Sequence, residues 1–396
     1  MQSKKNIIGG MFMILGTCIG AGMLAIPMVS AHESFRLSAL LLTVAWLCMT
    51  IGAFAVLEVN LWFKSGSNLI TMAEGTLGAW GKTVTSLLYL LLMYSLICAY
   101  LASASGVLQT FFSTVDLHVS RALATIITLV LLGGIVCRGM GAVDIANRLF
   151  MGIKLIIFML IVIALAPQIR VEKLYAGDFS IRNSAFIVMV TSFGYATILP
   201  TLREYLHSDR KALQRIVLAG SLVPFVIFLI WLCIVQGVLP RTGEHGLIAM
   251  AESSNSSSRL MFAITHVAHN RWMPYIASIF VSVYVLTSFL SVSISLADFI
   301  ADGLNKTKRG KNGVLIHALC FLPPLFIVLL KPGIFIKALA YAGIWCIILL
   351  MILPLLMLYS GRYKHTLSDH HILPGGRWFL SVMLGIAGAF LIMQFF

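Results

Sequence analysis

The chain has 396 residues, of which 60% are hydrophobic and only 11% are charged, and its formal net charge is +14. Soluble domains carry about 45–50% apolar and about 25% charged residues. A mean hydropathy of +0.98 leaves too little polar surface to cover a water-soluble core. Apolar runs long enough to cross a bilayer recur from end to end, so the sequence predicts a polytopic protein of the lipid bilayer. A secreted domain, a cytosolic enzyme and a nucleic-acid binder are excluded.

Runs of about 20 apolar residues predict eleven membrane-spanning helices in one all-α domain covering 1–396. In chain order they cover about 7–31, 37–63, 83–112, 121–137, 148–166, 184–206, 213–239, 273–300, 314–330, 334–359 and 378–396. The longest polar segments between them are 64–82, 167–183 and 240–272. We expect the serine-rich stretch 253–258 to be a mobile external loop.

The distribution of Lys and Arg predicts the orientation. These residues are more numerous on the side of the N-terminus, and the basic run 306–311 is the strongest single anchor. By the positive-inside rule the N-terminus is cytoplasmic, and eleven spans then place the C-terminus on the opposite side. The seven cysteines lie mostly inside apolar runs without a CxxC motif, so we expect neither disulfides nor a metal site.

The first span carries residues that disfavour a continuous helix: Gly16, Gly20, Gly22 and Pro27. In lipid, a broken helix is tolerated only where its free backbone groups face protein, water or a ligand. The alternative interpretation is a helix-packing face made by the small residues Gly16 and Gly20.

The sixth span contains a similar interruption, with Gly194 shortly before Pro200. Interruptions in the first and sixth of eleven spans are typical of a five-plus-five inverted repeat with two discontinuous helices. Such a pair indicates a substrate site near the middle of the membrane.

The run Gly-Thr-Cys-Ile-Gly-Ala-Gly-Met-Leu-Ala-Ile-Pro at 16–27 resembles the first-helix signature of bacterial aromatic amino acid permeases, the tyrosine- and tryptophan-specific transport proteins. The runs Thr-Ser-Phe-Gly-Tyr at 191–195 and Pro-Thr-Leu-Arg-Glu-Tyr-Leu at 200–206 resemble their sixth helix. Leu-Thr-Ser-Phe-Leu at 286–290 and Leu-Ala-Asp-Phe at 296–299 resemble their eighth. The resemblance implies a LeuT-type fold with repeats at about 7–166 and 184–359 and an extra helix at about 378–396. It also implies the bacterial inner membrane, with a cytoplasmic N-terminus and a periplasmic C-terminus.

The resemblance further implies an amino acid site at the two interruptions, and the chemistry of helix ends supports it. The N-terminus of a second half-helix attracts a carboxylate, and the C-terminus of a first half-helix attracts an ammonium group. We expect the carboxylate at the amides of Ala21, Gly22 and Met23, where Gly20 and Gly22 let the backbone approach the ligand. The ammonium group is expected at the carbonyls of Thr17, Cys18, Thr191 and Ser192.

Five side chains are candidates for the pocket around the substrate side chain: Phe193, Tyr195, Tyr94, Cys98 and Tyr284. Phe193 is the strongest, because it lies within an interruption; for the others helix packing is the alternative. An aromatic wall suits an aromatic substrate through stacking, but it suits a large aliphatic one as well.

Lys154 lies in the fifth span, about two turns from its cytoplasmic end. A charge at this depth is costly and by default functional; the alternative is a side chain that extends to the cytoplasmic interface. In the LeuT-type fold this position lies beside the first interruption and the pair Thr287 and Ser288. Sodium-coupled relatives hold Na⁺ there, and some proton-coupled ones have a lysine instead. The resemblance therefore implies that Lys154 takes the place of the sodium ion and carries a proton.

Glu58, near the cytoplasmic end of the second span, is a weaker candidate for a gate or proton path, and helix packing with a local hydrogen bond is the preferred interpretation. The sequence thus predicts proton-coupled uptake of tyrosine or another aromatic amino acid. It implies no cofactor other than the coupling proton, no metal, no nucleic acid and no obligatory protein partner. A tryptophan-preferring or sodium-coupled symporter is the alternative. A membrane enzyme would need a cluster of acid–base residues at mid-membrane depth, which the sequence lacks.

Overall fold

Helices build the part of the chain that this computed structural model describes, as the composition predicts. The described residues are 4–20, 22–114, 116–138, 140–179, 183–244, 246–253, 255–268, 271–308, 310–367 and 371–393. The first half of the chain contains α1 (Lys4–Cys18), α2 (Gly22–Val29), α3 (Phe35–Trp62), α4 (Leu69–Leu77), α5 (Ala79–Thr114), α6 (Arg121–Cys137), α7 (Met140–Leu165), the short 3-10 helix η1 (Ala166–Gln168) and α8 (Val171–Tyr175).

The second half begins with a helix in three pieces, α9 (Asn183–Thr191), the 3-10 helix η2 (Gly194–Ile198) and α10 (Leu199–Tyr205). Then follow α11 (Arg210–Val238), α12 (Leu247–Glu252), α13 (Ser256–Ala268), α14 (Met273–Gly303) and α15 (Gly310–Leu330). The last elements are α16 (Phe335–Ile347), the π-helical turn η3 (Ile348–Ile352), α17 (Leu353–Tyr363) and α18 (Arg377–Ile392).

Several helix starts follow from capping residues in the sequence. The side chains of Ser34, Asn68, Ser120 and Asp209 each accept a hydrogen bond from a backbone amide in the first turn of the helix that follows. Such caps satisfy amides that have no partner inside the helix.

Counted by helix length and composition, the candidate membrane spans are fewer than the eleven predicted. Within the described residues, eight helices are long and apolar enough to cross a membrane, and the bent pair α1–α2 makes a ninth candidate. The two remaining predicted spans coincide with α6 and α18, which have only 17 and 16 residues. At 1.5 Å per residue these are about 25 Å long, short of the roughly 30 Å hydrocarbon core.

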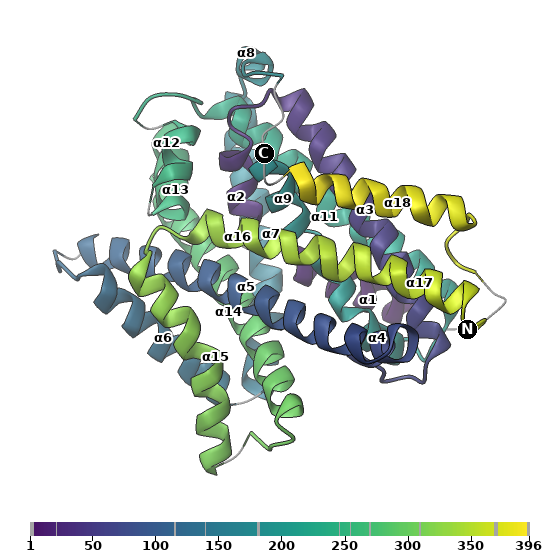
Figure 1. Cartoon of the computed structure of the whole chain (residues 1–396). Coiled ribbons are helices and arrows are strands. Elements are labelled where there is room, and N and C mark those ends of the chain that lie inside the picture. The colour runs from purple at the N-terminus through teal and green to yellow at the C-terminus, as the bar shows by residue number, and fades with distance from the viewer. Residues whose placement is uncertain are drawn as a thin grey trace.

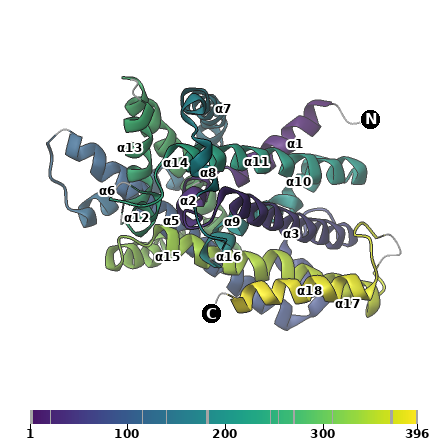
Figure 2. The same ribbon diagram turned by 90° about the horizontal axis from the view of Figure 1, so that it is seen from above.

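The two short half-helices α2 and α9 lie inside the bundle (Figure 1). Every residue of α2 is buried, and α9 is buried from Ala185 to Val190. α2 packs against α9, α11 and α12, whereas α9 packs against α3 and α16. α18, in contrast, lies at the periphery alongside α16 and α17 (Figures 1 and 2).

The prediction of a mobile serine-rich loop at 253–258 is wrong for 256–258, and residue 254 lies outside the described residues. Ser256 begins α13, and Ser256 and Ser257 are each only 3% exposed. Ser103 Oγ on α5 donates a hydrogen bond to Ser257 Oγ at 2.8 Å. The serines are therefore small polar residues that allow α13 to pack closely on α5, and low sequence complexity does not indicate mobility here.

Candidate functional site

The first helix is interrupted between α1 and α2, which meet at an angle of 52°. The Gly20 amide donates to the Cys18 carbonyl at 2.9 Å, and the Met23 amide donates to the Gly20 carbonyl at 3.1 Å. The last helical hydrogen bond of α1 is that of the Ile19 amide to the Leu15 carbonyl, at 2.9 Å, and helical structure resumes at Gly22, in the segment where the glycines predict a break. Ala21, one of the predicted carboxylate-binding residues, lies outside the described residues.

The second interruption separates α9 from α10. The helix changes to the 3-10 form at Gly194, and Pro200 stands in the first turn of α10. Thr191 Oγ1 donates to the Leu339 carbonyl of α16 at 2.9 Å, and Ser192 Oγ donates to the Val188 carbonyl at 3.2 Å.

The two interruptions touch each other and α14 through glycines. A Cβ atom added to Gly22 would lie 2.5 Å from Ser192 Oγ. One added to Gly20 would lie 2.8 Å from Ser288 Oγ and 3.8 Å from the Tyr100 hydroxyl. Glycine is therefore required at both positions for steric reasons, since any side chain would push apart the elements that meet there. We call the predicted substrate site around Gly20, Gly22 and Ser192 the cradle.

Lys154 reaches this cradle from α7. Its ammonium group donates to the Ile19 carbonyl, in the first interruption, at 3.1 Å and lies 5.0 Å from the centre of the Tyr284 ring. The residue is only 3% exposed. Lys154 is thus directed into the protein at this break, and its side chain does not extend to the surface.

Thr287 and Ser288 follow Tyr284 by one turn of α14, so they lie on the side of this helix that faces Lys154. Thr287 Oγ1 donates to the Val283 carbonyl at 2.8 Å and Ser288 Oγ donates to the Tyr284 carbonyl at 2.8 Å, so both hydroxyl protons are used within the helix. Their oxygens keep lone pairs for a further partner.

The candidate aromatic residues do not all lie around one space. Phe193 is fully buried and packs edge-on against Phe228 of α11, with ring centres 5.4 Å apart. The Tyr195 hydroxyl is directed to Thr50 of α3 at 3.3 Å. Tyr94 and Cys98 are directed away from the breaks toward α15: Tyr94 donates to the Leu319 carbonyl at 2.7 Å, and Cys98 Sγ lies 4.0 Å from the Pro324 carbonyl.

The residues that flank the first interruption differ in exposure. Cys18 and Met23 are buried, whereas Gly16 and Thr17 are exposed, and nothing lies within 4 Å of a Cβ added to Gly16. The Thr17 hydroxyl donates to the Met13 carbonyl at 2.9 Å. One flank of the break is therefore open.

α14 reverses its buried face halfway along its length. In its first half the face that carries Tyr275 (67% exposed) and Ile279 (48% exposed) is accessible, whereas the face of Tyr284 is buried. In its second half the face of Tyr284 becomes partly accessible. The polar positions on that face, spaced three or four residues apart, are Ser288, Ser291, Ser295 and Asp298. Asp298 forms an ion pair with Lys308 at the far end. A polar, open face thus runs from the interruption to the basic end of the bundle.

Sequence reasoning did not single out Tyr100, whose hydroxyl lies near Gly20, or Trp231 and Phe280, whose ring centres are 5.4 Å apart. They belong to long apolar helices where nothing in the local pattern distinguishes an aromatic residue buried between helices from one that faces lipid. Among the described residues, no group of three His, Cys, Asp or Glu side chains could hold a metal ion.

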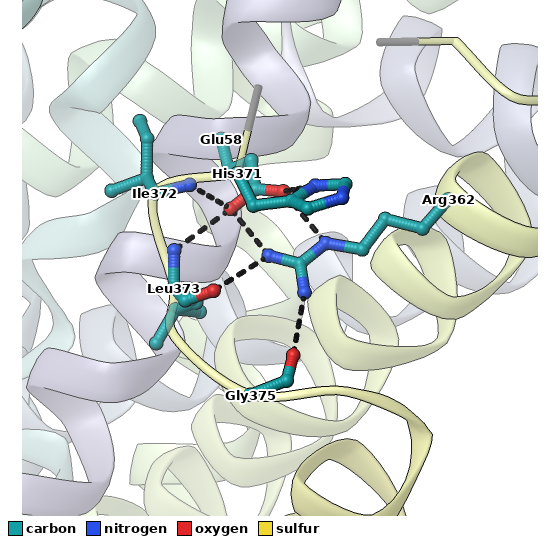
Figure 3. A network of polar contacts seen from close by, with 6 residues as sticks. All are labelled: Glu58, Arg362, His371, Ile372, Leu373 and Gly375. Carbon is teal, nitrogen blue, oxygen red and sulfur yellow. Dashed lines mark hydrogen bonds and ion pairs between the residues drawn. The ribbon is translucent and has the colours of Figure 1, made fainter. Parts of the chain in front are cut away.

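Glu58 lies at a distance from the cradle, in a buried ion pair that joins α3 to the end of the chain (Figure 3). Arg362 of α17 donates to both carboxylate oxygens, at 2.8 and 2.7 Å. The amides of Ile372 and Leu373 donate to Glu58 Oε2, at 2.7 and 2.9 Å, and Arg362 also donates to the Gly375 carbonyl at 3.2 Å. Glu58 therefore has a structural role, as the preferred interpretation holds, but through a long-range ion pair that anchors the segment leading into α18 and not through a local hydrogen bond.

Two interrupted helices that meet inside a bundle of membrane-spanning helices are the arrangement of secondary transporters. The sequence matches the tryptophan/tyrosine permease family over residues 3–394. The chain therefore belongs to the tryptophan/tyrosine permease family, a family of transporters and not of enzymes.

Individual relatives are similar over nearly their whole length. The chain is 28% identical to "Tyrosine-specific transport system 2" of Haemophilus influenzae, over 99% of this chain and 97% of that protein. It is 28% identical to "Tryptophan-specific transport protein" of Shigella flexneri, over 97% and 93%. It is 29% identical to "Glutamine transporter 2" of Aliivibrio fischeri, over 98% and 99%.

Proposed function

We propose that this chain takes up tyrosine, or another aromatic amino acid, together with protons across the bacterial inner membrane. The observation that carries the proposal is the Lys154 ammonium group bound to the Ile19 carbonyl in the interruption of the first helix. The names of two relatives support an aromatic substrate, and the buried Phe193 beside the second interruption supplies an aromatic surface. Tryptophan is the alternative within this class.

In this proposal the substrate carboxylate binds at the N-terminus of α2, around Gly22 and Met23. The ammonium group binds at the carbonyls of Thr17 and Cys18 and of Thr191 and Ser192, at the ends of α1 and α9. Half-helix ends supply these partners without buried side-chain charges. The Met23 amide donates to the Gly20 carbonyl at 3.1 Å, so a carboxylate that binds this amide takes the place of that carbonyl as its acceptor.

The position of Lys154 favours proton coupling over sodium coupling. A sodium ion bound by the Thr287 and Ser288 oxygens would lie close to the ammonium group. Two unit positive charges about 4 Å apart repel by about 4 kcal/mol at an effective dielectric constant near 20. We therefore infer that a proton on Lys154 and a sodium ion exclude each other, and that Lys154 performs the coupling.

We infer that α6 and α18 also cross the membrane, tilted little, which gives eleven spans with a cytoplasmic N-terminus and a periplasmic C-terminus. The repeats are then 7–166 and 184–359, with α18 as an extra helix. In this orientation the open polar face of α14 leads from the cradle to the cytoplasm. That face, with the exposed Gly16 and Thr17, supports an inward-facing conformation in which substrate leaves along Ser291 and Asp298.

Transport by the purified chain in proteoliposomes tests the proposal. We expect accumulation of labelled tyrosine driven by an inward proton gradient, unchanged when K⁺ replaces Na⁺ and abolished by a protonophore. Lys154→Ala should lose accumulation. Lys154→Arg, whose charge is permanent, should bind tyrosine without normal cycling.

Three results would contradict different parts of the proposal. A requirement for sodium, or accumulation by Lys154→Ala, refutes the coupling role of Lys154. Competition by glutamine but not by tyrosine or tryptophan refutes the substrate class. Absence of any amino acid uptake refutes the function as a whole.

A further inference from the structure

The surroundings of the Lys154 amine leave hydrogen-bonding capacity unused. An ammonium group has three N–H donors, and one of them reaches the Ile19 carbonyl at 3.1 Å. On the α14 side the group that faces it is the titratable Tyr284, whose ring centre lies 5.0 Å away. α6, α11 and α14 pack against α7, and α1 ends at the first interruption. Among the described residues, no acidic side chain of these helices forms an ion pair with Lys154.

Two more polar atoms nearby are buried without a protein partner. The Tyr284 hydroxyl and the Trp231 indole nitrogen belong to fully buried side chains, and neither has a hydrogen-bond partner among the described residues. Tyr195, which is equally buried, does have one, the Thr50 hydroxyl at 3.3 Å. Buried polar groups almost always find partners, so an unpartnered one indicates a bound water or ion.

These atoms form two layers along neighbouring helices. Lys154 on α7 and Tyr284 on α14 make one layer. Phe158, one turn after Lys154, and Phe280, one turn before Tyr284, make the second layer. Trp231 of α11 packs between them, and its ring centre lies 6.3 Å from that of Phe158 and 5.4 Å from that of Phe280. Trp231 thus lies one turn beyond Lys154, on the side opposite to the open face of α14.

We infer that water binds inside the protein at Tyr284 and Trp231, and that Lys154 exchanges its proton with the outside through this water. The inference rests on the proposed proton coupling. An indole N–H only donates, so Trp231 holds a water by its oxygen, whereas the Tyr284 hydroxyl can donate and accept. In the transfer, an O–H bond of protonated water breaks, and the lone pair of the neutral Lys154 amine forms the new N–H bond. Trp231 and Tyr284 are positioning residues in this step.

Water suits this place better than an ion. A cation would be repelled by protonated Lys154, and no carboxylate among the described residues pairs with that group. An anion held by the three donors would keep Lys154 charged and stop it from cycling. A water can turn to serve both forms of the amine, which proton exchange requires.

Radiolytic hydroxyl labelling of the wild-type protein tests for the water, because radicals formed in bound water oxidise the side chains next to it. Tyr284 and Tyr195 are a matched pair: both are fully buried, and only the Tyr284 hydroxyl lacks a protein partner. We expect Tyr284 to be labelled several times faster than Tyr195. Equal rates would refute the water site, whatever ion drives transport.

Substitution of Trp231 tests for the path. Trp231→Phe removes the N–H and keeps an aromatic ring. We expect the initial rate of pH-gradient-driven uptake to fall about three- to tenfold, the scale of one lost hydrogen bond. Exchange of labelled for unlabelled substrate at equal pH on both sides should stay at the wild-type rate, because exchange needs no net proton transfer.

Trp46→Phe is the control, because the Trp46 indole already donates to a protein partner, Ser221 Oγ, at 3.1 Å. This substitution should leave both rates unchanged. Unchanged gradient-driven uptake by Trp231→Phe would refute the path even if Tyr284 is labelled. If Trp231→Phe loses exchange as well, the labelling rates of Tyr284 and Tyr195 decide the inference. Uptake that stops when gluconate replaces chloride would identify an anion in place of the water and overturn it.

Discussion

The contact between the two interrupted helices makes a strong prediction for Gly22. A methyl group at this position would lie 2.5 Å from Ser192 Oγ, whereas an ordinary contact begins near 3.4 Å, so the hydroxyl would have to move by about 0.9 Å. That movement breaks the hydrogen bond of Ser192 Oγ to the Val188 carbonyl. Overpacking costs about 1–3 kcal/mol and a lost hydrogen bond about 1 kcal/mol. Only the end of the Ser192 side chain has to move, so the steric cost lies at the low end of this range, and alanine favours a helix over glycine by about 1 kcal/mol. We therefore expect Gly22→Ala to lose about 1–2 kcal/mol of the free energy of unfolding.

The structure also supplies a compensating change. The Cβ atom of Ser192 would lie 3.5 Å from the new methyl group, an ordinary contact, so only the hydroxyl oxygen is in the way. The double variant Gly22→Ala with Ser192→Ala should therefore be more stable than Gly22→Ala alone. Such non-additivity is expected for residues in direct contact.

Denaturant titration in mixed micelles measures these differences, with Gly16→Ala as the matched control. Gly16 lies in α1, before the same interruption, and has open space around it. Alanine favours a helix over glycine by about 1 kcal/mol, so the Gly16→Ala protein should be as stable as the wild type or more stable. Wild-type stability in Gly22→Ala, or a further loss on adding Ser192→Ala, would show that the helices do not meet at this contact.

The positions of the interruptions could be predicted from the sequence because glycine and proline act locally. Gly20, Gly22 and Gly194 lower the local helix propensity, and both breaks lie where these residues stand, although single glycines such as Gly152 and Gly220 lie inside continuous helices. The all-helical fold follows in the same way from long apolar runs, and the family confirms a transporter. Eleven spans and the inverted repeat remain predictions, because α6 and α18 are too short to count by length alone.

The contacts between distant helices could not be predicted in the same way. Tyr94 and Phe193 are both aromatic residues in apolar spans, yet one bonds to α15 and the other lies at the second break. Helix rotation decides which of them faces the site, and it depends on packing along the whole helix. The roles assigned to these residues, and to Lys154 in coupling, stay predictions.

Three further measurements test the site and its surroundings. Phe193→Ala should weaken tyrosine binding by about 1–3 kcal/mol but alanine binding much less, and equal losses in competition assays would make Phe193 a packing residue. Ser291→Cys, on the open face of α14, should react with an impermeant maleimide from the cytoplasmic side, whereas Ser282→Cys, on the opposite face, should not; equal labelling would mean that the open face is not a water-filled path. The last prediction concerns the buried pair of Glu58 and Arg362. Removing one member of such a pair leaves an uncompensated charge and costs about 3–5 kcal/mol. Arg362→Met should therefore be destabilised, because the buried Glu58 carboxylate then keeps only the amides of Ile372 and Leu373 and the half-exposed His371 ring, whose Nδ1 lies 3.4 Å from Oε1, as partners among the described residues. Adding Glu58→Gln removes the charge, while its carbonyl oxygen can still accept from those amides, so the double variant should regain stability. Losses that simply add would show that the anchor of α18 does not depend on charge compensation.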